Sequence, residues 1–190
     1  MRRFFLILAA AAICMAAAGQ SSRYGVKSGI LKLVASTGGP DKTEQTQYFD
    51  RYGAEESVTY TMDIPGIVTY DIWMITKGAD MWSVTVTDGK RAVKKSQNPT
   101  PDLNFLKPTP EAVQKYNLQE VGEERFLNRN CKVFTYETKQ GRRTVQNKAW
   151  VYKGVILKSE MQVGRRTATV TAVEFKENVR VPDGVFNTGE

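Results

Sequence analysis

Apolar and polar residues alternate along most of this chain with the two-residue period of a β-strand. The runs Val68–Met74, Trp82–Thr87 and Ala168–Glu174 show the pattern, and they are rich in Thr, Val, Tyr and Trp. These residue types suit a pleated surface with one buried face. Residues 72–75 are apolar on both sides, so the pattern leaves open which face is buried there.

Turn-forming residues separate the alternating runs. Asp88-Gly89 is typical of a two-residue hairpin loop, and Lys153-Gly154 marks another tight turn. We therefore expect about ten or eleven short antiparallel strands, joined mainly by hairpins. They include residues 30–35, 58–62, 68–76, 81–87, 132–138, 144–152, 155–162 and 167–177.

One interval, residues 98–116, departs from the strand pattern. A polar, proline-rich stretch is followed by the apolar residues Leu103, Phe105 and Leu106. Thr109-Pro110-Glu111 then has the signs of a helix start, with Thr as the N-cap, Pro at the first helical position and an acid in the first turn. The sequence predicts a short helix, Pro110–Tyr116, that could lie across one face of the sheet.

The N-terminus has the layout of a cleavable secretory signal peptide. Arg2 and Arg3 precede an apolar run that ends near Met15, and small residues follow at 16–18. The run is too short to span a membrane. We expect cleavage after residue 18, export to the periplasm and a single domain over residues 19–190. Acylation at Cys14 is the alternative, but Ile13 stands where a small residue is normally required.

The missing side chains exclude several kinds of catalytic site. The chain has no histidine, which rules out Ser-His-Asp and Cys-His catalysis and zinc sites with imidazole ligands. Cys131 is the one cysteine beyond the signal, so we interpret it as a small buried residue, with a reactive thiol as the alternative. Glu55-Glu56 and Lys158-Ser159 would face apart on strands. We expect a non-enzymatic protein with no cofactor and no metal.

The formal net charge is +7, and much of the excess lies near expected turns. Such a surface attracts anionic partners. Export argues against nucleic acid, so peripheral contact with an anionic lipid surface is the functional hypothesis. Solubilising charge is the alternative. The basic pairs are Lys90-Arg91, Lys94-Lys95, Arg142-Arg143 and Arg165-Arg166.

The remaining candidates for function are large apolar side chains on neighbouring strands. A curved sheet with one apolar face must cover that face, as a closed barrel or as a half-open barrel with an apolar cavity. Each residue could line such a cavity or belong to an ordinary core. The cavity candidates are Tyr70, Ile72, Met74, Trp82, Val84, Val86, Phe134, Tyr136, Trp150 and Tyr152, and Leu103, Phe105, Leu106 and Val113 could form a lid.

Several stretches resemble the LolA/LolB-like group of Gram-negative periplasmic proteins, the lipoprotein-sorting carriers and their relatives, with the uncharacterised Bacteroidetes branch the most similar. Together they span most of the mature chain, and their order and spacing carry more weight than any one motif. They are residues 48–56, 104–106, 124–134, 150–158 and 177–186.

This resemblance implies a mostly β fold, a single curved antiparallel sheet that forms an incomplete barrel with a short helical lid. It also implies that lipid or lipoprotein acyl chains are held in the hollow. The carriers have an arginine in the stretch comparable to Tyr70–Trp73, and this chain has none there. That difference places lipoprotein transfer in doubt.

Two functions follow as hypotheses. One is a periplasmic protein that binds a lipid or another apolar ligand in the half-barrel. The other is a cell-envelope interaction module with a self-filled core, which contacts a protein partner or an anionic glycolipid. The ligand, the oligomeric state and the strand face that lines the hollow are left open.

Overall fold

The structure is a computed structural model that describes residues 22–39, 41–64, 66–141 and 143–189. The predicted signal peptide, Cys14 and Arg142 lie outside the described residues. One antiparallel sheet of eleven strands has the order β6-β5-β4-β3-β2-β1-β11-β10-β9-β8-β7. The strands are β1 (Gly29–Ser36), β2 (Lys42–Asp50), β3 (Glu55–Ile64), β4 (Val68–Lys77), β5 (Asp80–Thr87), β6 (Lys90–Gln97), β7 (Gln119–Phe126), β8 (Arg129–Gln140), β9 (Arg143–Tyr152), β10 (Val155–Val163) and β11 (Arg166–Glu177).

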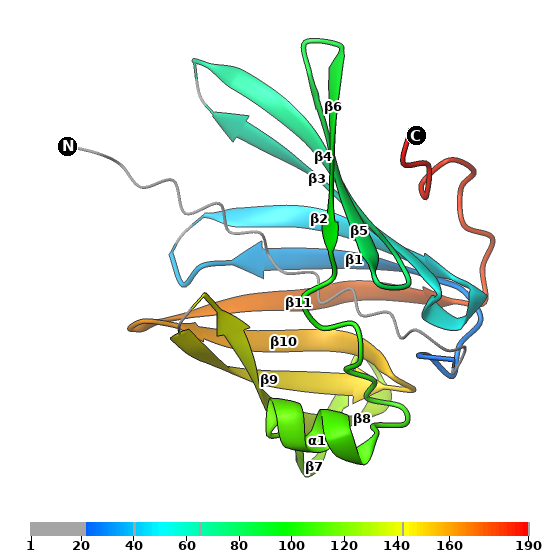
Figure 1. Cartoon of the computed structure of the whole chain (residues 1–190), viewed down its shortest axis with the longest axis vertical. Helices are drawn as coiled ribbons and strands as arrows, with labels where there is room; N and C mark the ends of the chain where they lie inside the picture. The colour runs from blue at the N-terminus through cyan, green and yellow to red at the C-terminus, as the bar shows by residue number, and fades with distance from the viewer. Residues whose placement is uncertain (1–21, 40, 65, 142, 190) are drawn as a thin grey trace.

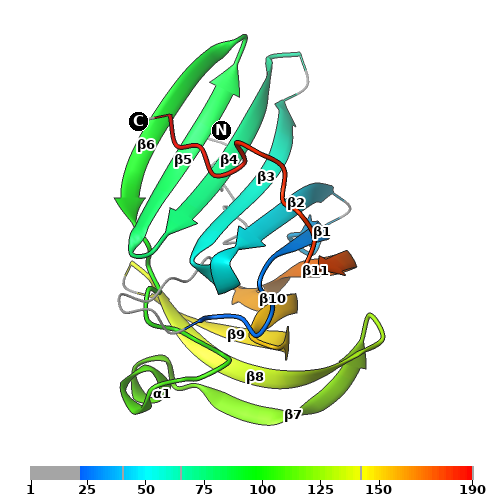
Figure 2. The ribbon, with the colours of Figure 1, turned by 90° about the vertical axis from the view of Figure 1, so that its right-hand side faces the viewer.

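The sheet is an incomplete barrel, as predicted. It bends into a C, with β6 along one lip and β7 along the other (Figure 1, Figure 2). The expected hairpin loop has positive φ at both Asp88 and Gly89, as the tight turn requires. At the start of β1, Gly29 is needed for a different reason, because a Cβ there would lie 2.6 Å from the ring of Phe49.

Helix α1 (Pro110–Tyr116) has the predicted bounds, and η1 (Arg51–Gly53) is a single 3-10 turn. The Thr109 hydroxyl accepts a hydrogen bond from the Ala112 N–H, which caps α1. The helix ends at Asn117, a left-handed residue. None of the helices in the described part of the chain is long and apolar enough to cross a membrane.

Strand register gives the sheet two faces. The face that α1 covers, here called the helix face, carries Phe134 and Ala149. Ala149 pairs with Ser159, Ser159 with Val170 and Val170 with Ala35. Paired residues point to the same side, so the helix face continues onto β1 and from there to β6. The opposite face, here called the tail face, is crossed by the C-terminal segment 178–189 (Figure 2).

Two clusters make up most of the core. In the first, Tyr24 and Val26 of the N-terminal segment pack with Leu31, Phe49 and Phe175. In the second, α1 and the segment before it pack on β8 and β9. A third and smaller cluster joins Ile75, Trp82 and Val84, with Trp73 packed against it. The first cluster is the larger and includes residues of β1, β2, β10 and β11, and the second lies at the end of the sheet that α1 reaches.

Candidate functional site

The register divides the ten predicted cavity residues between the two faces. Successive residues of a strand point to opposite sides, so the ten cannot line one surface. The residues predicted on β4 and on β5 are all even-numbered. In the sheet, however, even-numbered residues of β4 pair with odd-numbered residues of β5, so the two predicted sets point to opposite sides. Tyr70, Ile72, Met74, Phe134 and Tyr136 lie on the helix face, whereas Trp82, Val84 and Val86 lie on the tail face. Trp150 and Tyr152 face away from Ala149 on β9, next to a register shift in β10, and Trp150 is buried in the first core cluster with Leu31 and Phe175.

The predicted lid occupies one end of the helix face. Leu103 and Phe105 are buried there. The Phe105 ring lies 5.2 Å from the Phe134 ring and 5.4 Å from the Tyr136 ring, centre to centre. Val113 is 38% exposed and lies outside this contact. The lid thus fills the hollow over β8 and β9 with the chain's own side chains.

A hydrogen-bonded latch holds the lid segment to its helix. The Tyr116 hydroxyl donates to Asp102 Oδ1 at 2.5 Å, and Lys115 Nζ donates to both carboxylate oxygens at 2.9 and 3.0 Å. Burial alone would raise the pKa of Asp102, but these hydrogen bonds outweigh it and hold the pKa below its usual value. The pKa of Tyr116 is raised to about 12, by burial and by its bond to Asp102.

The other end of the helix face carries an apolar patch on β3 and β4, and α1 does not reach it. Tyr60 pairs with Ile72, and Met62 pairs with Tyr70. Met74 pairs with the buried Val58 at the end of the patch. Five side chains are half-buried or partly exposed there and define the β3–β4 patch: Tyr60, Met62, Tyr70, Ile72 and Met74.

Burial disfavours ionisation of one residue in this patch. It raises the pKa of the Tyr60 hydroxyl, because the charged phenolate is disfavoured away from water. Tyr60 and Met62 were missed as site candidates, although the alternation Val58-Thr59-Tyr60-Thr61-Met62 is visible in the sequence. That run could have been aligned with Tyr70–Met74 through the short turn between the two strands.

A buried ion pair marks the boundary between the patch and the N-terminal core. Arg23 bonds to Glu56, which is 1% exposed, and Gln47 Nε2 donates to the same carboxylate at 3.1 Å. Glu56 pairs with Thr76 on the helix face, next to the row of Val58 and Met74. The pair satisfies charges that would be costly if buried alone.

The candidate catalytic pairs are separated by the sheet. Glu56 lies on the helix face and Glu55 on the tail face. Ser159 and Lys158 are divided in the same way, and the Lys158 ammonium lies 3.9 Å from the centre of the Trp150 ring. Among the described residues, no group of three or more His, Cys, Asp or Glu side chains could hold a metal ion. Cys131 is fully buried, and burial raises the pKa of its thiol.

Neither a family model nor a curated protein matches the chain. Among solved structures, an uncharacterised conserved protein from Thermus thermophilus is 11% identical, with 85% of this chain and 89% of that chain covered at a TM-score of 0.52. This likeness concerns the fold alone. A LolA superfamily protein from Nitrosomonas europaea aligns at a TM-score of 0.43 and 10% identity, over 88% of this chain and 93% of that chain.

Proposed function

We propose that this protein binds a lipid or a similar apolar ligand on the helix face of β3 and β4, without catalysing a reaction. The observation that best supports this proposal is the β3–β4 patch, in which five large apolar side chains lie on two paired strands. They are incompletely buried, on the side of the sheet that the lid covers elsewhere. A contiguous apolar surface of this kind favours an apolar ligand.

The lid supplies a physical precedent within the same molecule. At the β8–β9 end, Phe105 covers Phe134 and Tyr136. An acyl chain lying along Tyr60, Ile72 and Met74 would cover the apolar face of β3 and β4, as Phe105 covers that of β8 and β9. The resemblance of the sequence to lipoprotein-sorting proteins points to the same ligand class. The periplasm, reached by way of the predicted signal peptide, is the proposed location.

The test is native mass spectrometry of the mature protein purified from a Gram-negative periplasm, followed by lipid extraction of the same sample. We expect a co-purifying lipid of defined mass. Met74→Glu places a charge in the patch and should abolish lipid retention. Val86→Glu is the matched control, because Val86 is also a half-buried apolar residue of the central sheet but lies on the tail face.

An unliganded mass that stays unchanged after incubation with membrane lipids would contradict the proposal. So would equal lipid retention by the Met74→Glu and Val86→Glu variants. Either result would favour the envelope interaction module with a self-filled core. In that alternative, β6 is the candidate contact surface. It is exposed along its whole length and carries four basic residues and no acidic one: Lys90, Arg91, Lys94 and Lys95. Charge reversal there should then release the protein from the envelope fraction.

A further inference from the structure

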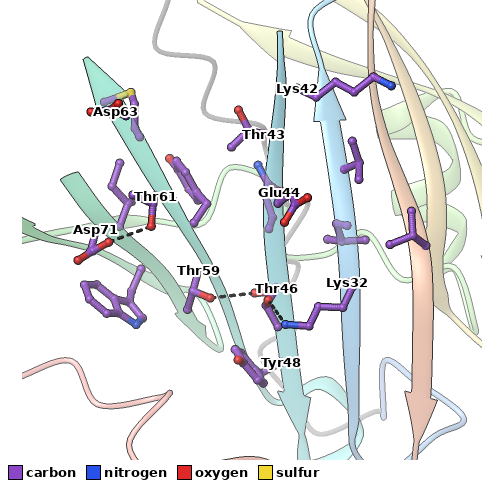
Figure 3. A pocket seen from close by; sticks show the side chains of 18 of the residues that line it. Lys32, Lys42, Thr43, Glu44, Thr46, Tyr48, Thr59, Thr61, Asp63 and Asp71 are labelled. Atoms are coloured by element: carbon purple, nitrogen blue, oxygen red, sulfur yellow. Dashed lines mark hydrogen bonds between the residues drawn. The ribbon is translucent and has the colours of Figure 1, made fainter. Parts of the chain in front are cut away.

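The tail face carries a large groove with a mixed polar and apolar lining. Three residues of the β3–β4 patch, Tyr60, Met62 and Ile72, are also among its lining residues. The groove lies over β1 to β4 and has a volume of 1220 Å³ (Figure 3). Val185 of the C-terminal segment and Val173 of β11 also line it. Pockets for single small molecules occupy about 300–1,000 Å³, so this groove has room for an extended ligand.

The floor of the groove has a regular composition set by strand register. Lys32, Thr46, Thr59 and Trp73 lie in one row across four strands. The Lys32 ammonium donates to the Thr46 hydroxyl at 3.0 Å, and the Thr59 hydroxyl donates to the Thr46 carbonyl at 3.4 Å (Figure 3). The row thus presents one ammonium, two hydroxyls and an indole ring to the same space.

The neighbouring rows repeat this mixture of hydroxyls and rings. The Thr61 hydroxyl donates to Asp71 Oδ1 at 2.9 Å on one side of the row, and the half-buried Tyr48 lies on the other side (Figure 3). Tyr48 and Trp73 therefore offer two ring surfaces with Thr59 of β3 between them, and Asp71 lies in the next row beyond Trp73.

Main-chain recognition is excluded on this floor. Strands β1 to β4 each have a paired strand on both sides, so their backbone groups are already bonded within the sheet. A peptide could not add as a further strand there. A ligand must be recognised through side-chain hydroxyls, carboxylates and ring faces alone, which favours a molecule that is itself dense in hydroxyl groups.

The charge of the groove disfavours an anionic ligand. Two lysines, Lys32 and Lys42, line it together with four carboxylates. The groove is therefore acidic on a chain whose formal net charge is +7. A polyanion would be repelled from it, whereas an uncharged ligand meets no such repulsion. The four carboxylates are Asp41, Glu44, Asp63 and Asp71.

We propose that the tail-face groove is a binding site for an uncharged oligosaccharide, with Trp73 and Tyr48 stacking on sugar rings. Thr46, Thr59 and the Asp71 carboxylate hydrogen-bond the sugar hydroxyls. An indole or phenol ring offers a flat apolar surface to the C–H face of a sugar, and the polar groups around it fix the orientation. The register places Thr46, Thr59 and Trp73 on the opposite face from Tyr60, Met62 and Ile72, although these three patch residues also line the groove.

Isothermal titration with uncharged hexasaccharides of glucose, xylose, mannose and N-acetylglucosamine tests the site. We expect at least one of them to bind with one-to-one stoichiometry. Trp73→Leu removes the ring platform and should weaken binding about tenfold or more. Thr46→Val removes one hydroxyl without changing the core and should weaken binding about fivefold.

A matched control exists on another hairpin. Lys139 Nζ donates to the Thr144 hydroxyl at 2.7 Å, the same kind of bond that Lys32 makes to Thr46, and Thr144 lies outside the groove. Thr144→Val should leave saccharide affinity unchanged. So should Met74→Glu, which separates failure of this site from failure of the lipid-binding proposal. Thermal unfolding of each variant reports whether it is folded.

Three outcomes would overturn the saccharide site. The first is an absence of binding to all four hexasaccharides by the folded protein. The second is binding that the folded Trp73→Leu and Thr46→Val variants retain in full. The third is binding of the protein to phosphatidylglycerol vesicles that Trp73→Leu abolishes and that none of the saccharides inhibits. That result would assign the groove to a lipid surface.

Discussion

The two ends of the helix face use similar side chains for different purposes. Over β8 and β9, Phe134 and Tyr136 are buried because the chain returns with Phe105 to cover them. Over β3 and β4, Tyr60 and Ile72 pair across the strands but stay half-buried, and α1 does not reach them. The difference lies in the cover and not in the strands. An apolar strand face is core where the chain supplies its own lid, and it is free to bind where the chain supplies none.

The largest difference between the patch and the buried core should appear in thiol reactivity. Cys131 of β8 is 0% exposed in the first core cluster, on the side of the strand away from the lid, and burial raises the pKa of its thiol. In a Cys131→Ala background, Met74→Cys places a thiol in the β3–β4 patch. With lipid removed, we expect iodoacetamide to modify that thiol at least about 100-fold faster than Cys131 reacts in the unaltered protein. Mass spectrometry over time measures both rates.

Denaturant provides the control for this comparison. In concentrated urea the two thiols should react at similar rates, because burial no longer separates them. Similar rates in the folded protein would mean that the patch is as well covered as the core, and the distinction between an open patch and a buried core would be lost. Added lipid should slow the reaction of the thiol introduced by Met74→Cys and leave Cys131 unaffected.

The next largest effect concerns the lid. Phe105→Ala removes the ring that packs on Phe134 and Tyr136 and leaves a cavity. We expect the free energy of unfolding to fall by about 3–5 kcal/mol, as is usual for a buried Phe. Urea denaturation followed by circular dichroism measures it. A loss below about 1 kcal/mol would show that the lid contributes little to the fold and that the covered end could open easily.

Truncation in the patch should cost less. Met74 is half-buried, so Met74→Ala in the lipid-free protein should lower the free energy of unfolding by about 1 kcal/mol, well below the roughly 2–5 kcal/mol of a buried Met. The same urea titration with the co-purified lipid retained should reveal a larger loss, because bound ligand stabilises the folded state and the variant would bind it weakly. Equal losses with and without lipid would argue against contact between the ligand and Met74.

The sequence predicted the elements better than it predicted their faces. The bounds of α1 follow from local chemistry: the Thr109 cap, Pro110 and the acid Glu111 act within one turn. Hairpins such as Asp88-Gly89 are equally local. The edge strands β6 and β7 are not among the residue ranges predicted as strands, because both are polar and exposed and lack an apolar face.

The candidate site depended on information that alternation does not contain. Within β4, residues 72–75 are apolar on both sides, so nothing local distinguishes Ile72 from Trp73. The register of β4 with β3 and β5 separates the two residues, and which face is covered depends on segments distant in the sequence. Trp150 shows the same effect: it is buried in the first core cluster, its indole N–H donates to Glu124 at 2.6 Å and Lys158 lies over its ring.

The smallest expected effect tests how the covered end is fastened. Asp102→Asn keeps an acceptor for the Tyr116 hydroxyl but removes the ion pair with Lys115. Because Asp102 is partly exposed, we expect a loss of less than about 1 kcal/mol in the free energy of unfolding at neutral pH. Urea denaturation at a series of pH values measures the difference between the variant and the unaltered protein.

The pH dependence of that difference identifies the carboxylate as its source. The pKa of Asp102 is lower in the folded protein than its ordinary value of 3.8. The ionised group therefore contributes stability above about pH 4, and the contribution is lost as the pH falls through the folded-state pKa. The variant and the unaltered protein should converge in that acidic range. A Lys115→Gln background should already show part of the loss, so Asp102→Asn should cost less there. A difference that persists unchanged at low pH would mean that the substitution acts through packing, and that the latch does not depend on its charge.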